Sequence, residues 1–248
     1  MEAKISQIKK DVLIASYEAG ACHIGSALSC VDILVNLFYV QKIKPEQFLF
    51  SKASGVATYY AILADLEYFP KEKLAEYLKN YPLPSTEVKG VIHSFGSLGH
   101  GLPVACGMAL GDRNTEYYVL LSDGELQEGS TLEACLFVAK HELKNLHIIV
   151  DYNRLQALGI VSDILLPKFP HNFLNGMGLW CNYVNGHNEK ELTLAFREQD
   201  SRFFNSKEPN ISLCITVKGW SIDFMAGDNS WHYRNLDKEH LEKALCQI

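Results

Sequence analysis

The chain has 248 residues, 48% of them hydrophobic, and a formal net charge of −6 at pH 7. That length can bury a full α/β core, and without a basic stripe the charge gives no support to a nucleic-acid partner. The seven cysteines form no Cys-x-x-Cys pair and no apolar run reaches membrane-spanning length, so we expect a reduced, cytoplasmic protein that does not enter the membrane.

Helical periodicity dominates the first part of the chain, in patterns at roughly 3–19, 29–40, 54–67 and 71–80. A proline-containing turn at Tyr81-Pro82-Leu83-Pro84 follows, and turn-forming residues continue to Gly96. A further helix is predicted over about 100–111.

The centre of the chain carries two apolar strands, Tyr117–Leu121 and Leu146–Val150, with a helical stretch between them. This order predicts a strand, a crossover helix and a parallel strand. Beyond Asn153 an irregular segment extends to about 179, and its length indicates a binding or interface loop.

The last elements expected are a strand over Cys181–Val184, a helix from about Leu192 through Gln199 to Phe203, and a strand over Ile211–Val217. The alternation of strands and helices predicts an α/β fold: a mostly parallel sheet with helices on both faces, in one domain spanning 1–248. Ligands of such sheets bind at the carboxyl ends of the strands.

Polar side chains follow both central strands at the point where each ends. Asp123 comes after the first strand, and Asn153 follows the second. Parallel neighbours lie about 4.8 Å apart, and two Mg²⁺ ligands can be no more than roughly 4.2 Å apart, so the pairing predicts a divalent-cation site. Either residue alone would be more simply explained as part of a turn.

The segment after Asp123 favours an anion. Gly124 and Gly129 permit close backbone approach, and Ser130 with Glu133 predicts a capping box at the start of the next helix. Helix starts offer unpaired N–H groups and a positive dipole end, so a diphosphate bridged to the protein by Mg²⁺ suits this position.

These motifs resemble the thiamine-diphosphate-binding module of transketolases over almost the whole chain. The family signature is Gly-Asp-Gly, a similar interval and then Asn, and transketolase-like members continue with Glu-Leu-Gln-Glu-Gly. The chain has Ser122 in place of the first Gly. The matching runs, in order, are Cys22-His23-Ile24-Gly25-Ser26, Gly96-Ser97-Leu98-Gly99-His100-Gly101-Leu102, Asp123 to Gly129, Asn153, Val217-Lys218-Gly219 and Trp231-His232.

The resemblance implies the cofactors thiamine diphosphate and Mg²⁺. Asp123 and Asn153 would bind the metal through their side chains and Leu155 through its carbonyl, while Gly124 and His232 would meet the phosphates. Gly96 and Leu98 would lie against the aminopyrimidine. The cofactor-binding residues expected on this basis are Ser54, Gly96, Leu98, Asp123, Gly124, Glu125, Asn153 and His232.

The same resemblance nominates two catalytic residues. His23 would face the reacting carbonyl group, and Glu128 matches a carboxylate that relays protons across a subunit interface. Without the motif, a lone histidine is more simply a structural residue, and Glu128 would merely favour the start of the following helix by its charge. Trp231 could likewise simply anchor the chain end on the core, and His232 would then be present only as its neighbour.

The resemblance also implies a partner. In this family the glutamate that activates the aminopyrimidine belongs to a second module, for which little chain remains after His232. We therefore expect a split transketolase, in which a C-terminal-type subunit supplies that module, assembled as a heterotetramer with two chains of each kind. It would transfer a two-carbon ketol unit between sugars or sugar phosphates.

Two departures leave the reaction open. Relatives read Ser-Lys-Gly-His-Ala where this chain reads Ser51-Lys52-Ala53-Ser54-Gly55, so Ser54 replaces an active-site histidine. The nearest counterpart of a second substrate histidine is Asn80-Tyr81-Pro82-Leu83, which has none. The alternatives are an acyloin-forming subunit, as in deoxyxylulose-phosphate synthases, and a non-catalytic partner-binding subunit.

Overall fold

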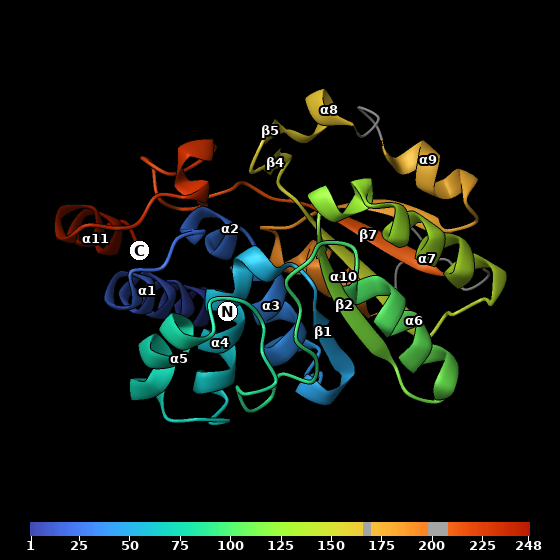
Figure 1. Ribbon diagram of the computed structural model, residues 1–248, viewed down its shortest axis with the longest axis horizontal. Helices are drawn as coiled ribbons and strands as arrows, with labels where there is room; N and C mark the ends of the chain where they lie inside the picture. Colours follow the sequence, from blue (N-terminus) through green and yellow to red (C-terminus); the bar gives the residue numbers. More distant parts are fainter. Residues whose placement is uncertain (166–169, 198–207) are drawn as a thin grey trace.

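A five-stranded parallel sheet forms the centre of the computed structural model, which describes residues 1–165, 170–197 and 208–248 (Figure 1). The strand order is β1-β2-β3-β7-β6. The strands are β1 (Phe48–Phe50), β2 (Tyr117–Ser122), β3 (Leu146–Tyr152), β6 (Trp180–Asn185) and β7 (Asn210–Ile215). The register pairs Ser122 with Asp151, so β2 and β3 end at the same edge of the sheet.

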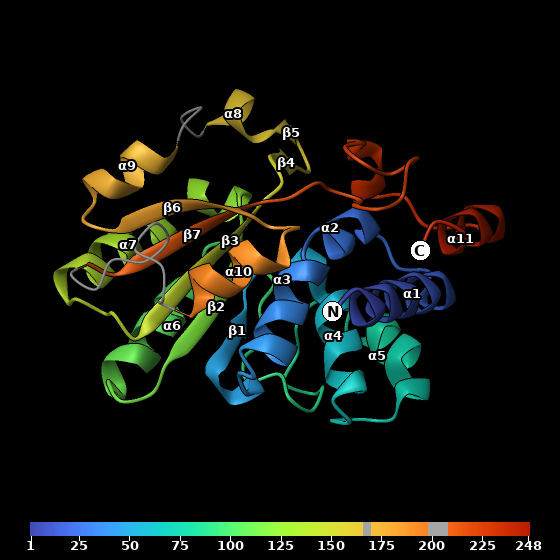
Figure 2. The ribbon, with the colours of Figure 1, turned by 180° about the vertical axis from the view of Figure 1, so that it is seen from behind.

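Helices cover both faces of this sheet. One face of the sheet shares its core with α1 (Glu2–Ala19), α2 (Ile24–Ser29), α3 (Val31–Val35), α4 (Val56–Asp65), α5 (Leu74–Asn80) and α10 (Glu189–Phe196). The other packs against α6 (Gly101–Gly111), α7 (Gly129–Lys140) and α9 (Pro170–Gly176). Figure 1 shows α6 and α7 in front of the sheet, and Figure 2, from behind, shows α3 and α10.

Alternation along the strands explains the two layers. Leu120 and Ile149 are buried in the core shared with the first group of helices, whereas Val119 and Ile148 are buried in the core beneath α6 and α7. Successive side chains of a strand point to opposite faces, so each apolar strand contributes to both cores.

Several smaller elements connect or flank these helices and strands. They are the antiparallel pair β4 (Leu155–Gln156) and β5 (Gly159–Ile160), the helices α8 (Val161–Ile164) and α11 (Lys238–Leu245), the π-helical turn η1 (Asn36–Val40), and the 3-10 turns η2 (Pro45–Gln47), η3 (Ala53–Gly55), η4 (Lys71–Lys73), η5 (Gly124–Gln127) and η6 (Asn229–His232). Within the described ranges, no helix is both long and apolar enough to cross a bilayer.

The predicted α/β architecture and the parallel β2-α7-β3 unit are confirmed. Several boundaries were wrong. The helix expected over 29–40 is divided among α2, α3 and η1, and the segment expected to be irregular contains β4, β5, α8 and α9. Strand β1 was missed, and the last strand ends at Ile215. The predicted helix through Gln199 and Phe203 ends at Phe196 as α10, and those two residues lie outside the described ranges.

Candidate functional site

The two residues expected to bind a cation lie together at the carboxyl edge of the sheet. Asp123 follows β2 and Asn153 follows β3, and both are buried. The Asp123 carboxylate accepts a 2.5 Å hydrogen bond from the backbone N–H of Arg154, which has a left-handed φ of 66°. The Asn153 side-chain oxygen accepts one of 3.0 Å from the N–H of Leu155. The turn after β3 is therefore tied directly to the end of β2.

Asp123 carries a poorly compensated charge in this position. Burial raises its pKa to about 7, and the negative charge of Asp151 contributes to the rise. The hydrogen bonds from Arg154 and from Gly124, the latter 2.8 Å long, oppose the shift without cancelling it. A cation at this carboxylate would remove the energetic cost of its ionisation.

A buried ion pair lies close enough to Asp123 to affect its charge. Lys52 Nζ is 2.8 Å from Asp151 Oδ2, and both side chains are almost completely excluded from solvent. Burial is the largest single effect and lowers the pKa of Lys52, but the charges of Asp151 and Asp123 and the hydrogen bond to Asp151 are among the effects that together outweigh it, so the pKa is raised. Ser29 and Thr216 also donate hydrogen bonds to Asp151. Hydrogen bonds from two further segments therefore fix the position of the pair.

Glu125 connects three segments around the same edge. One oxygen accepts hydrogen bonds from Ser51 Oγ and the Gly99 N–H, and the other accepts from the N–H and hydroxyl of Ser122. Burial raises the pKa of this carboxyl. These contacts hold the 96–101 loop against the ends of β1 and β2. Direct contact with a cofactor stays a prediction for Glu125.

The predicted capping box after Asp123 is wrong. Helix α7 begins with Glu128 at its N-cap and has no side-chain capping bond. The Ser130 hydroxyl instead donates a 2.8 Å hydrogen bond to the carbonyl of Gly99. Gly99 has a φ of 80°, and a Cβ there would lie 2.6 Å from Glu128 Cβ. The start of α7 is thus packed against the loop that carries Gly96 and half-exposed Leu98.

The substrate end expected from the sequence is built around two histidines. His23 has a left-handed φ of 66° at the start of α2, and its N–H donates to the carbonyl of His232 at 3.1 Å. The two rings meet edge to face at 4.8 Å. Burial lowers the pKa of His23, as do the charges of Lys218 and Lys52, and burial with the charge of Lys218 lowers the pKa of His232 to about 3. Both rings are therefore neutral at pH 7.

Ser54 and Cys22 lie at this same end. Together with His23 they line a cavity of about 170 Å³. Ser54 Oγ is 2.9 Å from Ser26 Oγ, which also receives a hydrogen bond from Lys52. The residue that replaces an imidazole in the motif is thus connected through Ser26 to the buried ion pair.

Lys218 joins the cation end to the histidines. Its buried Nζ lies 3.4 Å from the carbonyl oxygen of Leu155, 2.9 Å from Asn229 Oδ1 and 2.7 Å from His232 Nδ1. Burial lowers its pKa to about 8, with a further contribution from the charge of Lys52. Lys218, Asn153 and Leu155 line a neighbouring cavity of about 470 Å³, which is bounded on one side by Ile160 of β5.

The structure brings the predicted cation-binding residues together at one end of the site: Asp123, Gly124, Asn153 and Leu155. His23, Ser54 and His232 lie at the other end of the site. Contacts of Lys218 and Lys52 connect the two ends. Gly96, Leu98 and Glu128 lie on or beside the 96–101 loop, where Gly96 lines a separate cavity of about 390 Å³. Sequence reasoning missed the Lys52–Asp151 pair and the contacts of Lys218. The available signals were a lysine two residues after the short strand β1 and an aspartate near the end of the mostly apolar strand β3.

Comparisons with known proteins identify the family of the chain. The profile of the family described as "Transketolase, thiamine diphosphate binding domain" matches residues 4–247. The chain is 33% identical to a subunit of the apulose-4-phosphate transketolase of Actinobacillus succinogenes, covering 100% of this chain and 95% of that protein. It is 30% identical to the 6-deoxy-6-sulfo-D-fructose transketolase subunit SqwG of a Clostridium species, covering 100% and 96%.

Solved structures share the fold. The transketolase of Campylobacter jejuni superposes with a TM-score of 0.87 at 24% sequence identity. The match covers 99% of this chain and 42% of that transketolase, so the chain corresponds to less than half of the longer protein.

Proposed function

Because this chain belongs to the transketolase family through its thiamine-diphosphate-binding domain, we propose that residues 1–248 form one domain that holds the cofactor's diphosphate through Mg²⁺ and that needs a second chain for turnover. The chain is a subunit of a thiamine-diphosphate-dependent, transketolase-type transferase that moves a two-carbon ketol unit between sugars. The observation that carries the magnesium proposal is the buried Asp123 carboxylate bound to the turn that carries Asn153.

The donor atoms suit Mg²⁺. Asp123 offers a carboxylate oxygen, Asn153 an amide oxygen and Leu155 a backbone carbonyl, which are the hard ligands this ion prefers. The raised pKa of Asp123 is a second sign of fit, because a bound dication would stabilise the ionised carboxylate against its burial.

The surrounding residues fit the rest of the cofactor. Lys218 and the neutral His232 would contact phosphate oxygens, and the backbone N–H of Gly124 lies beside Asp123. Gly96 and Leu98, with Glu128 beside their loop, would meet the aminopyrimidine end together with the second chain. When bound, thiamine diphosphate supplies the nucleophilic carbon that carries the two-carbon unit.

The chain's own part in the reaction is to orient the sugar and to hold protons. Cys22 occupies Nδ1 of His23, which leaves Nε2 as the nitrogen for a substrate oxygen. A neutral imidazole with that proton on Nε2 can donate a hydrogen bond to a carbonyl or hydroxyl oxygen. Ser54, which lines the same cavity, would hydrogen-bond a substrate hydroxyl at the position where the family motif has a histidine.

The partner and the substrates follow from the relatives. Proteins named as subunits of an apulose-4-phosphate transketolase and of a 6-deoxy-6-sulfo-D-fructose transketolase cover this chain fully. We propose that this chain pairs with a C-terminal transketolase-type subunit in a cytoplasmic heterotetramer, two chains of each kind, acting on sugars or sugar phosphates. All seven cysteines are free, as a reducing compartment requires.

The test is reconstitution of the complex. The chain should be purified with the product of the neighbouring gene, and thiamine diphosphate binding measured by calorimetry with Mg²⁺ or with EDTA. Ketose-phosphate cleavage with transfer to an aldose is then assayed separately from pyruvate decarboxylation. Mg²⁺-dependent binding with ketol transfer supports the proposal. Pyruvate decarboxylation without ketol transfer would point to acyloin formation, and binding without either turnover to a non-catalytic subunit.

A further inference from the structure

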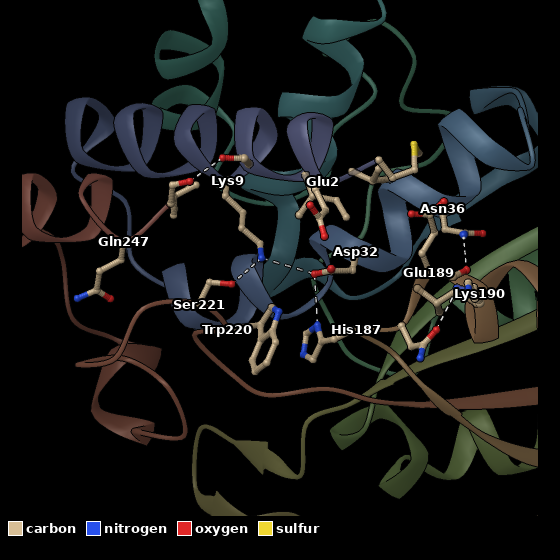
Figure 3. A pocket seen from close by; sticks show the side chains of 17 residues that line it. Glu2, Lys9, Asp32, Asn36, His187, Glu189, Lys190, Trp220, Ser221 and Gln247 are labelled. Atoms are coloured by element: carbon tan, nitrogen blue, oxygen red, sulfur yellow. Dashed lines mark hydrogen bonds and ion pairs between the residues drawn. The ribbon is translucent and has the colours of Figure 1, made fainter.

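A second cavity shares the 216–221 segment with the cofactor site. Val217 and Lys218 line the cavity beside Asn153, whereas Trp220 and Ser221 line another of about 730 Å³. The latter is enclosed by α1, α3, the start of α10 and the chain end (Figure 3). One short segment of backbone therefore lines the proposed cofactor site and also this second cavity.

Three buried charged or titratable side chains meet in this space. His187 Nδ1 lies 3.3 Å from Asp32 Oδ2, and Lys9 Nζ lies 3.8 Å from the same oxygen. The exposed fractions of the three side chains are 9% for His187, 9% for Asp32 and 5% for Lys9. Figure 3 shows them converging from α1, α3 and the loop before α10. Such a buried cluster requires a reason, because burying charge is costly.

The hydrogen bonds define which nitrogen of His187 carries the proton. The backbone N–H of Val217 donates to His187 Nε2 at 2.9 Å, so Nε2 is the acceptor. The proton of the neutral ring is then on Nδ1, where it is donated to Asp32. Trp220 stacks on the same ring at 4.2 Å with an interplanar angle of 14°. Asp32 thus fixes the tautomer and Trp220 fixes the plane of the imidazole.

The far end of the segment is held by the same cluster. Lys9 Nζ donates a 2.8 Å hydrogen bond to Ser221 Oγ, and Ser221 has a left-handed φ of 76°. Between these two attachments the chain passes through Lys218, whose ammonium group contacts Leu155 and His232 at the cofactor site. Because the polar groups of the cluster satisfy one another, the cavity requires no ligand to explain them.

We propose that Asp32 and His187 are positioning residues for Lys218: through the Val217 N–H they set the backbone from which Lys218 reaches the diphosphate and the metal-binding turn. The inference rests on the proposed function, since it assumes that Lys218 faces the cofactor. Neither residue touches substrate or cofactor. Their effect travels through one backbone hydrogen bond to the residue adjacent to Lys218.

The test compares two replacements of His187 in the assembled complex. Gln places its side-chain oxygen near the position of Nε2 and can accept from Val217, whereas Asn is too short and reaches only the position of Nδ1. Thiamine diphosphate affinity at saturating Mg²⁺, turnover at saturating cofactor, and amide hydrogen exchange of 216–221 are measured for each. His171→Asn, on α9, is the matched control for loss of an imidazole elsewhere.

His187→Asn should weaken cofactor affinity about tenfold and speed exchange of the Val217 amide about tenfold, because a buried N–H loses its acceptor. Turnover at saturating cofactor should stay within about twofold, and His187→Gln should keep all three quantities within about twofold of the unmodified complex. If His187 contributed only to general stability, the melting temperature of both variants would fall, and the Asn and Gln variants would not differ in cofactor affinity or amide exchange.

Unchanged exchange at 216–221 in His187→Asn, or equal loss of affinity in both variants, would overturn the inference. If His187→Asn does not fold, Asp32→Ala takes its place, since it removes the group that fixes the tautomer and should speed the same amide. Hydrogen exchange needs no cofactor. A complex that binds no thiamine diphosphate would therefore refute the proposed function while the exchange result still decides the role of His187.

Discussion

The thiol of Cys22 lies 3.1 Å from Nδ1 of His23, the residue whose imidazole is expected to face the substrate. Burial raises the pKa of this thiol, so it stays protonated near neutral pH and can donate its hydrogen to the ring. His23 also has a left-handed backbone conformation and makes an edge-to-face contact with His232. Side chain and backbone together give this imidazole one orientation and one tautomer.

Cys22→Ala should lower kcat of the assembled enzyme about tenfold with little change in the KM of the donor sugar. The thiol donates to Nδ1, and without it the ring can take the other tautomer, with no proton on Nε2. Cys22→Ser restores a donor and should recover most of the rate. Steady-state kinetics of the three proteins test this, and a serine variant as slow as the alanine variant would contradict it.

Asp123→Asn should reduce Mg²⁺-dependent retention of thiamine diphosphate by at least about a hundredfold, because the carboxylate is the only anionic ligand expected from this chain. The amide oxygen can still accept the hydrogen bond from Arg154, so the fold should be kept. Calorimetry with the assembled complex measures the affinity. Asp163→Asn, an exposed aspartate in the first turn of α8, should leave it unchanged.

The position of Asp123 beside the turn after β3 could be predicted from sequence because each step is local. Apolar runs mark β2 and β3, the intervening helical pattern requires a parallel crossover, and the register then fixes which ends meet. Asp123 and Asn153 were predicted for that reason. Their roles as metal ligands stay predictions.

The buried cations could not be predicted in the same way. Lys52 and Lys218 each follow shortly after the end of an apolar strand, and a lysine outside the strands is usually exposed. Lys52 is buried because Asp151, on another strand, neutralises it, and Lys218 because three acceptors from distant segments surround it. Strand β1 was missed for a related reason, since its three residues are too few to show a period.

Lys52→Met should destabilise the chain by about 3–5 kcal/mol, because it leaves the Asp151 carboxylate buried without its cation. Hydrogen bonds from Ser29 and Thr216 remain but do not supply a positive charge. The double variant Lys52→Met/Asp151→Asn should recover part of the loss. Urea unfolding of the single and double variants gives the coupling free energy, and additive losses would show that the two side chains do not act as a pair.

Gly99→Ala should destabilise the chain by about 1–2 kcal/mol and weaken assembly with the partner. A side chain at φ 80° is strained, and its Cβ would lie 2.5 Å from Ser130 Oγ and 2.6 Å from Glu128 Cβ. Urea unfolding of the isolated chain measures the loss. Gly107→Ala is the matched control. It lies inside α6 with nothing within 4 Å of its Cβ and should stabilise the isolated chain by about 0.5–1 kcal/mol.

His232→Asn should make the stability of the metal-free chain depend less on pH in acid. Burial and the charge of Lys218 lower the folded-state pKa of His232 to about 3, whereas the unfolded chain has the ordinary value of 6.5. Between these values the unfolded state binds more protons, so this histidine makes stability fall as the pH drops from about 6.5 towards 3.

Asn keeps a side-chain oxygen near the position of Nδ1, where Lys218 donates, but it does not titrate. Melting temperatures recorded in EDTA across this window should therefore fall less steeply for the variant, and above pH 7 the difference between the two proteins should no longer depend on pH. Parallel curves would show that the His232 ring is not desolvated beside Lys218.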